Sequence, residues 1–386
     1  MDAGLVARVR ARAFPSRLHD DDRIAAILGI ALGVSFGTCF VTGVLSHLIQ
    51  EPPAWFHWPP RPAGLYRVTQ GVHVVTGIAT IPLLFAKLWV VYPKLFRWPP
   101  FEGLAHFLER IMLVPLIAGA LFQVFSGLAN INIWYPYPFG FRGAHYWVAW
   151  ITIGALIVHV GAKLSTTRAA LSRTYRATEP VPSALADGGL DRRGFLGAVF
   201  ATSGLLALFT AGQTFRPLER LALLAPRRPN EGPQGFAVNR TAAGAGVEAA
   251  ARDPGYRLVV EGRVPRLLRL SLDELRQMPQ HEASLPIACV EGWSTTQRWR
   301  GVRIRDLLDR AGASDDAEVI VRSLERSGPS AAALLERGHA RDRDTLLALE
   351  VAGEPLHLDH GFPARLIGPN RPGTMQTKWV ERLVVR

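Results

Sequence analysis

The stretch Ile287-Ala-Cys-Val-Glu-Gly-Trp-Ser294 decides how the C-terminal part of the chain is interpreted. Its cysteine, Cys289, is one of only two among 386 residues, so it does not belong to a disulfide framework. A cysteine that ends an apolar strand and precedes Glu-Gly-Trp is suited to hold a soft metal through its thiolate. The alternative is a buried structural thiol, which is how Cys39, in an apolar run, is interpreted. The rest of the chain favours the metal ligand.

Apolar residues make up 48% of the chain but are distributed unevenly. Long runs almost free of charge precede residue 215, whereas later apolar residues come in short groups. This pattern predicts a membrane part joined to a soluble part. The net charge of +12 does not indicate a nucleic-acid partner, because Lys and Arg flank the apolar segments instead of forming a stripe with aromatic residues.

Five segments are long and apolar enough to cross a bilayer, which takes about 20 residues of helix. They are residues 24–49, 66–92, 104–128, 144–164 and 194–212. The fold class that follows is an α-helical membrane bundle of four helices (24–164) plus a fifth anchor helix (194–212). A basic tail (1–23) precedes the bundle, a linker (165–193) precedes the anchor, and a soluble α+β domain occupies 225–386.

The distribution of basic residues sets the orientation of these helices. Basic residues are concentrated in three segments that would share one side: Arg8, Arg10, Arg12, Arg17 and Arg23; Lys94 and Arg97; and Lys163, Arg168, Arg173, Arg176, Arg192 and Arg193. The intervening loops, 50–65 and 129–143, hold only Arg61 and Arg142 and are rich in Trp and Tyr. We therefore expect a multi-pass protein of the cytoplasmic membrane, in contact with lipid, with a cytoplasmic N-terminus and an extracytoplasmic C-terminal domain.

The fifth helix is preceded by Asp191-Arg-Arg-Gly-Phe-Leu-Gly197. This run resembles a twin-arginine export signal, with Asp191 where Ser or Thr is commoner. The alternative is an ordinary basic flank of a membrane helix. The resemblance implies export of a folded, cofactor-loaded domain by the twin-arginine translocase.

Histidines within apolar helices indicate function, because ionisable groups are costly in a bilayer. His145 and His159 lie 14 residues apart, which is about 21 Å along one helix and within roughly 40° of one face. Two metal sites can therefore be stacked along this helix, as two b haems held by imidazole pairs would be.

The depth of each histidine in its predicted span suggests the haem ligands. We expect His106 with His159 for an inner haem and His73 with His145 for an outer haem. His47 is an alternative outer ligand, or contacts a propionate or a quinone. Lys87 follows His73 by 14 residues and has three open roles: snorkelling to the interface, pairing with a propionate, or serving a quinone. Residues 24–164 resemble the di-haem cytochrome b anchors of formate dehydrogenases and hydrogenases.

Short strands and helices are predicted after residue 225. Strands are expected at 256–261, 286–290, 318–324, 346–351, 365–367 and 378–385, with a capping box at Ser271-Leu-Asp-Glu274 and a helix at 302–310 closed by Gly312. The runs Cys289–Ser294, Trp299–Leu308, Gly353-Glu-Pro-Leu, Asp359–Leu366 and Gly373–Trp379 follow one another in the chain. In that order they resemble the molybdenum domain of the sulfite oxidase family, which includes periplasmic methionine sulfoxide reductase.

This resemblance implies a molybdenum–molybdopterin cofactor with Cys289 as the protein ligand of the metal and the catalytic residue. It implies further cofactor contacts at these positions: Asn239, Arg240, His360, Arg365, Gln376, Thr377 and Lys378. The chain lacks a C-terminal dimerisation extension and an attached soluble haem domain. Arg298, Arg300 and Arg303 either line an anion entrance or lie on the surface.

The sequence thus predicts a membrane-bound molybdenum oxidoreductase that transfers oxygen atoms on a small extracytoplasmic substrate and exchanges electrons through two haems with the quinone pool. Two alternatives belong to other classes. One is a haem-only electron carrier or ferric reductase with a non-catalytic soluble domain. The other is a cofactor-free structural or sensor protein of the membrane.

Overall fold

The computed structural model describes residue 18 and residues 21–96, 103–172, 191–225, 228–328 and 331–386. Most of the basic N-terminal tail and most of the linker 165–193 lie outside these residues. The chain divides into two compact units. The first contains residues 1–43 and 73–210, and the second contains residues 44–72 and 211–386.

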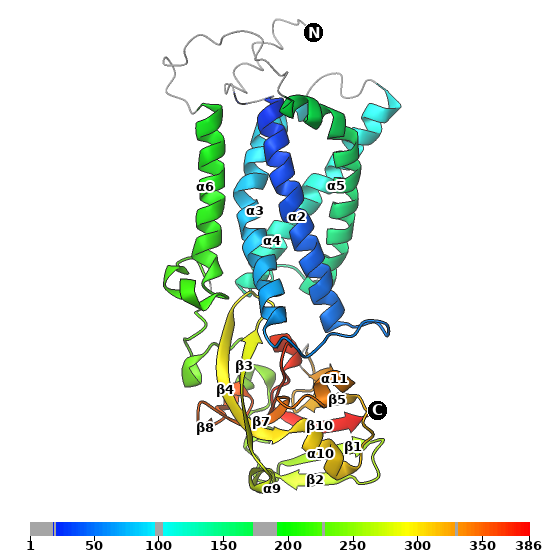
Figure 1. Ribbon diagram of the computed structural model, residues 1–386, viewed down its shortest axis with the longest axis vertical. Coiled ribbons are helices and arrows are strands. Elements are labelled where there is room, and N and C mark those ends of the chain that lie inside the picture. Colours follow the sequence, from blue (N-terminus) through cyan, green and yellow to red (C-terminus); the bar gives the residue numbers. More distant parts are fainter. Residues whose placement is uncertain (1–17, 19–20, 97–102, 173–190, 226–227, 329–330) are drawn as a thin grey trace, which may run out of the picture. The chain divides into compact units, whose positions relative to one another are not determined.

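Five long helices dominate the first half of the chain (Figure 1). They are α2 (Asp22–Gln50), α3 (Leu65–Leu95), α4 (Leu104–Ile131), α5 (Phe141–Leu171) and α6 (Arg192–Ala211). The five predicted helices are therefore confirmed. Helices α2, α3 and α4 are three or four residues longer than expected, α5 is ten residues longer, and the ends of α6 are shifted by one or two residues. By length and composition all five are apolar enough to cross a membrane.

Helix ends and irregularities follow from local chemistry. Pro82 lies inside α3 and Pro115 inside α4. Asp191 accepts a hydrogen bond from the backbone N–H of Gly194 at 2.7 Å, so it caps the start of α6. The position of Asp191 in the Arg-Arg run, where Ser or Thr is commoner, thus has a local explanation, because all three residue types cap helices well.

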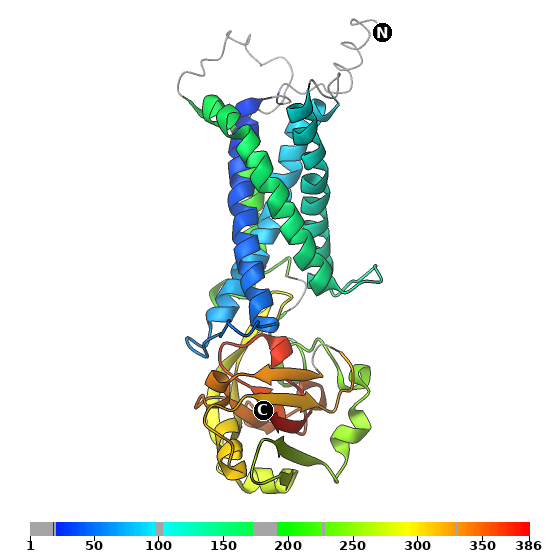
Figure 2. The ribbon, with the colours of Figure 1, turned by 90° about the vertical axis from the view of Figure 1, so that its right-hand side faces the viewer.

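The second unit contains two five-stranded sheets, seen in yellow to red in Figure 2. Sheet A has the order β2 (Leu268–Ser271), β1 (Arg257–Gly262), β10 (Val380–Val385), β5 (Val319–Ser323) and β6 (Ala332–Leu335). Sheet B has the order β3 (His281–Ala288), β4 (Ser294–Arg303), β7 (Leu346–Val351) and β8 (Glu354–Pro355), with β9 (Arg365–Ile367) also paired to β7. All pairs are antiparallel except β1 with β10.

Short helices connect these strands. They are η2 (Arg216–Leu221), η3 (Pro233–Gly235), α7 (Ala242–Ala245), α8 (Glu248–Arg252), α9 (Leu272–Gln277), α10 (Ile304–Ala311), α11 (Arg337–Ala340), η4 (Leu358–His360) and η5 (Gly373–Met375). The predicted capping box of Ser271 and Glu274 is present at α9. Gly312 ends α10 in the left-handed region, as predicted. Strands β7 and β9 have the predicted bounds, whereas β2, β4, β6 and β8 were not predicted.

Strand β7, at the centre of sheet B, is buried on both faces, and this fixes the position of Cys289. Along β7, Leu347 and Leu349 contact one apolar cluster with residues of sheet A and α10, whereas Leu346 and Ala348 contact a second cluster. Successive side chains of a strand point to opposite faces, so β7 separates the two clusters. The second cluster contains Cys289. The cysteine is therefore held by a sheet that cannot shift register without exposing apolar side chains.

The segment between α2 and α3 belongs to the second unit, although the sequence assigned it to the helical bundle (24–164). Trp58 Nε1 donates to the carbonyl of Asn370 at 2.9 Å, and the backbone N–H of Tyr66 donates to Asn370 Oδ1 at 2.7 Å. Arg61 forms ion pairs with Asp342 and Asp344. These contacts join residues about 300 positions apart, which no local pattern predicts.

We predict that Gly301→Ala destabilises the second unit. A Cβ at this position would lie against the backbone of Leu347 and 2.7 Å from the Cα of Ala348. We expect the free energy of unfolding to fall by about 2 kcal/mol, which lowers the unfolding temperature in calorimetry by roughly 5 °C. Gly338→Ala is the control, because a Cβ there meets only Pro60 at 3.6 Å. Equal unfolding temperatures for the two variants would contradict this account.

Candidate functional site: a buried cysteine turn and paired histidines

Cys289 lies at the tight turn that joins β3 to β4. The register pairs Ala288 with Ser294, so the loop contains only residues 289–293. The backbone N–H of Cys289 donates to Trp293 O at 2.9 Å, and Gly292 N–H donates to Cys289 O at 3.0 Å. Gly292 has a φ of 95°, a region that favours glycine. The turn chemistry therefore fixes the direction of the Cys289 side chain.

The thiol of Cys289 is buried and meets polar groups. It lies 2.9 Å from Glu291 Oε2 and 2.9 Å from Asn239 Nδ2. Asn239 also donates to Glu291 Oε2, and Trp293 Nε1 donates to the same oxygen at 3.1 Å. Burial, and then the neighbouring Glu291 carboxylate, raise the pKa of the Cys289 thiol. A thiolate here thus needs a strong positive partner such as a metal ion.

Two cationic groups, the buried Arg365 and the half-buried Lys378, interact electrostatically with this sulfur. The pKa of Arg365 is lowered to about 9 by burial and is raised in part by Cys289. Its guanidinium lies 5.5 Å from the centre of the Trp299 ring and donates to the His360 carbonyl at 3.1 Å. Burial, and then Arg365, lower the pKa of Lys378 to about 7. Such cations, kept partly desolvated, are suited to an anionic ligand.

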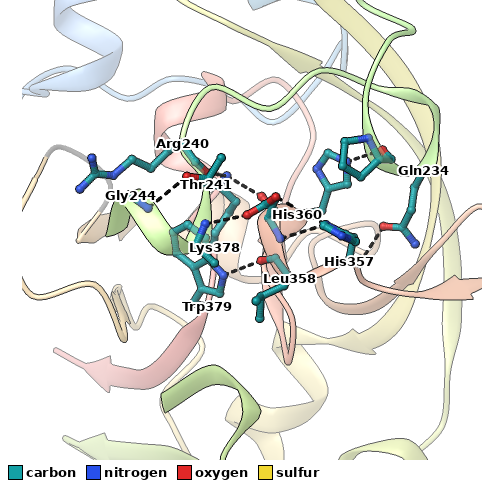
Figure 3. A network of polar contacts seen from close by, with 12 residues as sticks. Gln234, Arg240, Thr241, Gly244, His357, Leu358, His360, Lys378 and Trp379 are labelled. Atoms are coloured by element: carbon teal, nitrogen blue, oxygen red, sulfur yellow. Dashed lines mark hydrogen bonds and ion pairs between the residues drawn. The ribbon is translucent and has the colours of Figure 1, made fainter. Parts of the chain in front are cut away.

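Lys378 joins two loops that are distant in the sequence (Figure 3). Its ammonium donates to Arg240 O at 2.6 Å and to Asp359 O at 2.7 Å, and it lies over the ring of Trp379. His360 stacks on Phe236 with ring centres 3.6 Å apart, and its Nε2 lies 2.6 Å from Pro233 O. Burial lowers the pKa of His360 to about 3, so its ring is neutral.

The predicted cofactor residues fit a polar organic cofactor. Four of them have a buried polar atom without a hydrogen-bond partner: Asn239 Oδ1, Arg365 Nε, Gln376 Oε1 and Thr377 Oγ1. Unsatisfied buried polar atoms are rare in native proteins and call for a partner. Arg240 differs from this set, because it forms an ion pair with Glu325 at 2.8 Å. Within the described ranges, no three His, Cys, Asp or Glu side chains are grouped as a metal site.

The helical unit brings His73 of α3 and His145 of α5 together. Their ring centres are 6.3 Å apart. An iron bonded to one nitrogen of each ring at about 2 Å would place the centres roughly 6 Å apart. Nδ1 of His73 lies 3.0 Å from Cys39 O and 3.1 Å from Thr42 Oγ1, and Nδ1 of His145 lies 2.9 Å from Ser126 Oγ. Metal-binding histidines commonly hold their second nitrogen in this way.

Glycine makes room beside these imidazoles. A Cβ on Gly43 would lie 3.1 Å from the His73 ring, and one on Gly127 would lie 3.9 Å from the His145 ring. The described residues show His73 facing His145. His47, in the last turn of α2, lies 3.9 Å from Glu51, and its role as an alternative outer ligand stays a prediction. Nδ1 of His159 is buried without a hydrogen-bond partner. The pairing of His159 with His106 stays a prediction.

The C-terminal domain is similar to known proteins. The family model of the oxidoreductase molybdopterin-binding domain matches residues 245–386. Mitochondrial sulfite oxidase of Mus musculus is 35% identical over 158 residues, which cover 34% of this chain and 29% of that protein. Residues 245–386 form a molybdopterin-binding oxidoreductase domain of the sulfite oxidase family. The predicted enzyme class, a molybdopterin-dependent oxidoreductase, is thereby confirmed for this domain.

Other relatives match the same domain. The uncharacterized oxidoreductase YuiH of Bacillus subtilis is 31% identical over 126 residues, which cover 32% of this chain and 62% of that protein. The structure of the sulfane dehydrogenase SoxCD of Paracoccus pantotrophus aligns with a TM-score of 0.32 and 25% identity, covering 34% of this chain and 38% of that one. The chain thus spans less than two thirds of the length of each of these proteins.

Glu291 is a site residue that the sequence prediction missed. The sequence showed an acidic residue two positions after Cys289, but only the hairpin turn brings its carboxylate to the sulfur. Two of the three arginines considered for an anion entrance are bound elsewhere: Arg300 pairs with Glu350 at 3.0 Å, and Arg303 donates to Arg343 O at 2.9 Å. The third, Arg298, is exposed. The cationic groups beside Cys289 are instead Arg365 and Lys378.

We predict that Glu291→Gln slows turnover about 100-fold, the usual effect of losing a positioned proton donor or acceptor. The amide keeps the size and polarity of the carboxylate next to Cys289 but does not exchange a proton. Metal analysis should show unchanged molybdenum content, so that the loss of rate is separated from a loss of the metal. Wild-type rates at all pH values would contradict a proton-handling role.

The lowered pKa of Lys378 predicts that the affinity for an anion depends on pH. Its pKa of about 7 means that the ammonium loses its proton as pH rises through neutrality. Arg365, with a pKa of about 9, stays charged at pH 8. Pyrophosphate, measured by calorimetry on cofactor-free protein, should therefore bind about tenfold more weakly at about pH 8 than at about pH 6. Lys378→Arg should remove this difference, because a guanidinium keeps its charge. Equal wild-type affinities would refute the assignment.

Proposed function

We propose that this chain is a membrane-bound molybdenum oxidoreductase. It transfers an oxygen atom to or from a small extracytoplasmic substrate and exchanges electrons with the quinone pool through two b haems. The observation that supports this most directly is the Cys289 turn, where a buried thiol contacts Asn239 and Glu291. The residues matched by the molybdopterin-binding family model also include Arg365, Gln376 and Thr377, each with a buried polar atom that has no hydrogen-bond partner. A thiol that merely fills a core would need apolar neighbours instead of Asn239 and Glu291.

When bound, the molybdopterin cofactor supplies a two-electron centre for oxygen-atom transfer. Cys289 ligates the metal through its thiolate, which burial would otherwise keep protonated. Arg365 and Lys378 balance the negative charge of the thiolate and of the pterin phosphate. Asn239 and Trp293 fix the carboxylate of Glu291 by hydrogen bonds, so that Oε2 holds or releases a proton next to the sulfur.

The electron and proton balance of the reaction explains why a proton acceptor is needed near the reacting atoms. Addition of oxygen from water to a substrate releases two electrons and two protons, and removal of oxygen consumes the same numbers. The protons need an acceptor near the reacting atoms. Glu291 is the carboxylate in contact with the Cys289 sulfur, so it is assigned this role.

Helices α2 to α6 form the membrane part in this proposal. Their length and apolar composition support it, and the basic flanks support a cytoplasmic N-terminus. His73 and His145 hold the outer haem, supported by their facing rings, and His106 and His159 hold the inner haem. The Arg192–Arg193 pair serves the twin-arginine translocase during export.

A pair of variants tests this function. Cys289→Ser should abolish turnover, because a hydroxyl is a poor ligand for a soft metal, and should leave the reduced-minus-oxidised haem spectrum intact. His145→Ala should remove one haem and leave the molybdenum content unchanged. The assay follows haem absorbance of purified protein after mixing with sulfite, dimethyl sulfoxide or trimethylamine N-oxide.

Each alternative has a distinct outcome in the same experiment. Haem bands without molybdenum in the wild-type protein would indicate a haem-only electron carrier or ferric reductase. The absence of both would indicate a structural or sensor protein. Turnover retained by Cys289→Ser would show that this thiol is not the metal ligand.

A further inference from the structure

The carbonyl next to Cys289 is held by a side chain from helix α3. Val290 O accepts a hydrogen bond from Nε2 of Gln70 at 2.9 Å. Gln70 lies in the second turn of α3 and is only 6% exposed. The same helix carries His73 three residues later. One hydrogen bond therefore links the cysteine turn to the helix of the proposed outer haem ligand.

The amide of Gln70 is fixed in one orientation. Its Oε1 accepts from Ser46 Oγ at 3.2 Å and from Tyr66 OH at 3.5 Å, and these two hydroxyls lie 3.1 Å apart. Tyr66 is 1% exposed. A flipped amide would present its N–H groups to these hydroxyls and its oxygen to a carbonyl. The network therefore directs the N–H groups of Gln70 at Val290 O.

The start of α3 and the cysteine turn are held together by further contacts. The hydroxyl of Thr214 donates to Gly292 O, and the backbone N–H of Ser294 donates to Gln213 O at 2.8 Å. Helix α3 approaches this segment at Gly71, where a Cβ would lie 2.6 Å from Cγ2 of Thr214. A larger residue does not fit there, so the close approach of Gln70 to the turn is built into the packing.

We propose that Gln70 is a positioning residue for electron transfer between the Cys289 site and the haem held by His73. This inference rests on the proposed function. The route runs through covalent bonds from the Cys289 sulfur to Val290 O, across the hydrogen bond to Gln70, and along α3 to His73, about 4.5 Å of helix rise. Electrons pass more readily through bonds and hydrogen bonds than across an open gap.

The redox balance is complete with the cofactors already named. When a substrate gains an oxygen atom from water, two electrons and two protons leave the reacting atoms. The electrons cross the Gln70 link one at a time, each reducing one ferric haem to ferrous. A quinone then takes up both electrons with two protons to give the quinol. Reduction of an oxidised substrate runs the same steps in reverse.

Flash photoreduction of the intact protein by a deazaflavin tests the link without a substrate. The haem is reduced by the flash, and its absorbance then reports the electron passing to the molybdenum centre. Gln70→Glu keeps the size of the side chain but places a carboxylate oxygen at Val290 O in place of the donor. We expect this relaxation to slow about tenfold, the effect on a rate of losing one hydrogen bond. Lowering the pH should restore the rate, because a protonated carboxyl donates again.

Three further measurements distinguish a loss of the Gln70 hydrogen bond from a general disturbance of the fold. Haem spectrum, haem reduction potentials and molybdenum content should match the wild type. Thr69→Ala is the matched control, since its hydroxyl donates to Tyr66 O within the same helix, and its relaxation rate should not change. Should Gln70→Glu lose a cofactor, Gln70→Met, which also lacks a donor, replaces it with the same expectation.

Two outcomes would overturn the inference. One refutes only the role of Gln70, and the other also refutes the proposed function. An unchanged relaxation rate in Gln70→Glu with both cofactors bound would refute the role of Gln70 and leave the proposed function standing. A wild-type protein in which photoreduced haem never exchanges an electron with molybdenum would refute both.

Discussion

The burial of one thiol in a five-residue hairpin turn is the constraint on which the site depends. A cysteine in this position is not a good thiolate by itself, because burial and Glu291 both favour the protonated form. The fold compensates by placing Arg365 and Lys378 near the sulfur, and their lowered pKa values show that they too lack solvation and a full counter-charge. For each of these three groups, the charged form is unfavourable without a partner of opposite charge. Together they suit one anionic, metal-containing ligand.

The burial of strand β7 on both faces gives this arrangement its rigidity. Strand β7 contacts one apolar cluster on each face, and β4 runs beside it through the bulge at Gly301. A shift of the β3–β4 hairpin would disturb both clusters at once. The cysteine turn is thus held by apolar packing around Cys289. It is also held by hydrogen bonds with Gln70, Gln213 and Thr214.

Prediction from sequence succeeded where the signal is local. The five apolar helices, the capping box at Ser271, the glycine that ends α10 and the strands β7 and β9 follow from composition, periodicity or turn chemistry. Strand β4 was missed because its polar and charged residues mask the alternation. Glu291 was seen as an acidic neighbour of Cys289, but its contact with the sulfur depends on the φ of 95° at Gly292.

The sequence by itself determined the class of this protein: apolar runs of membrane length, histidines within them, and an ordered series of short motifs around one cysteine. Those features depend on residue type and on spacing along the chain, which need no coordinates. Only the tertiary structure decided that residues 44–72 pack with the C-terminal domain, that the rings of His73 and His145 face each other, and that Gln70 donates to the residue after Cys289. These contacts join positions up to about 300 residues apart. Their geometry depends on how distant parts of the chain pack, and local residue propensities carry no information about that packing.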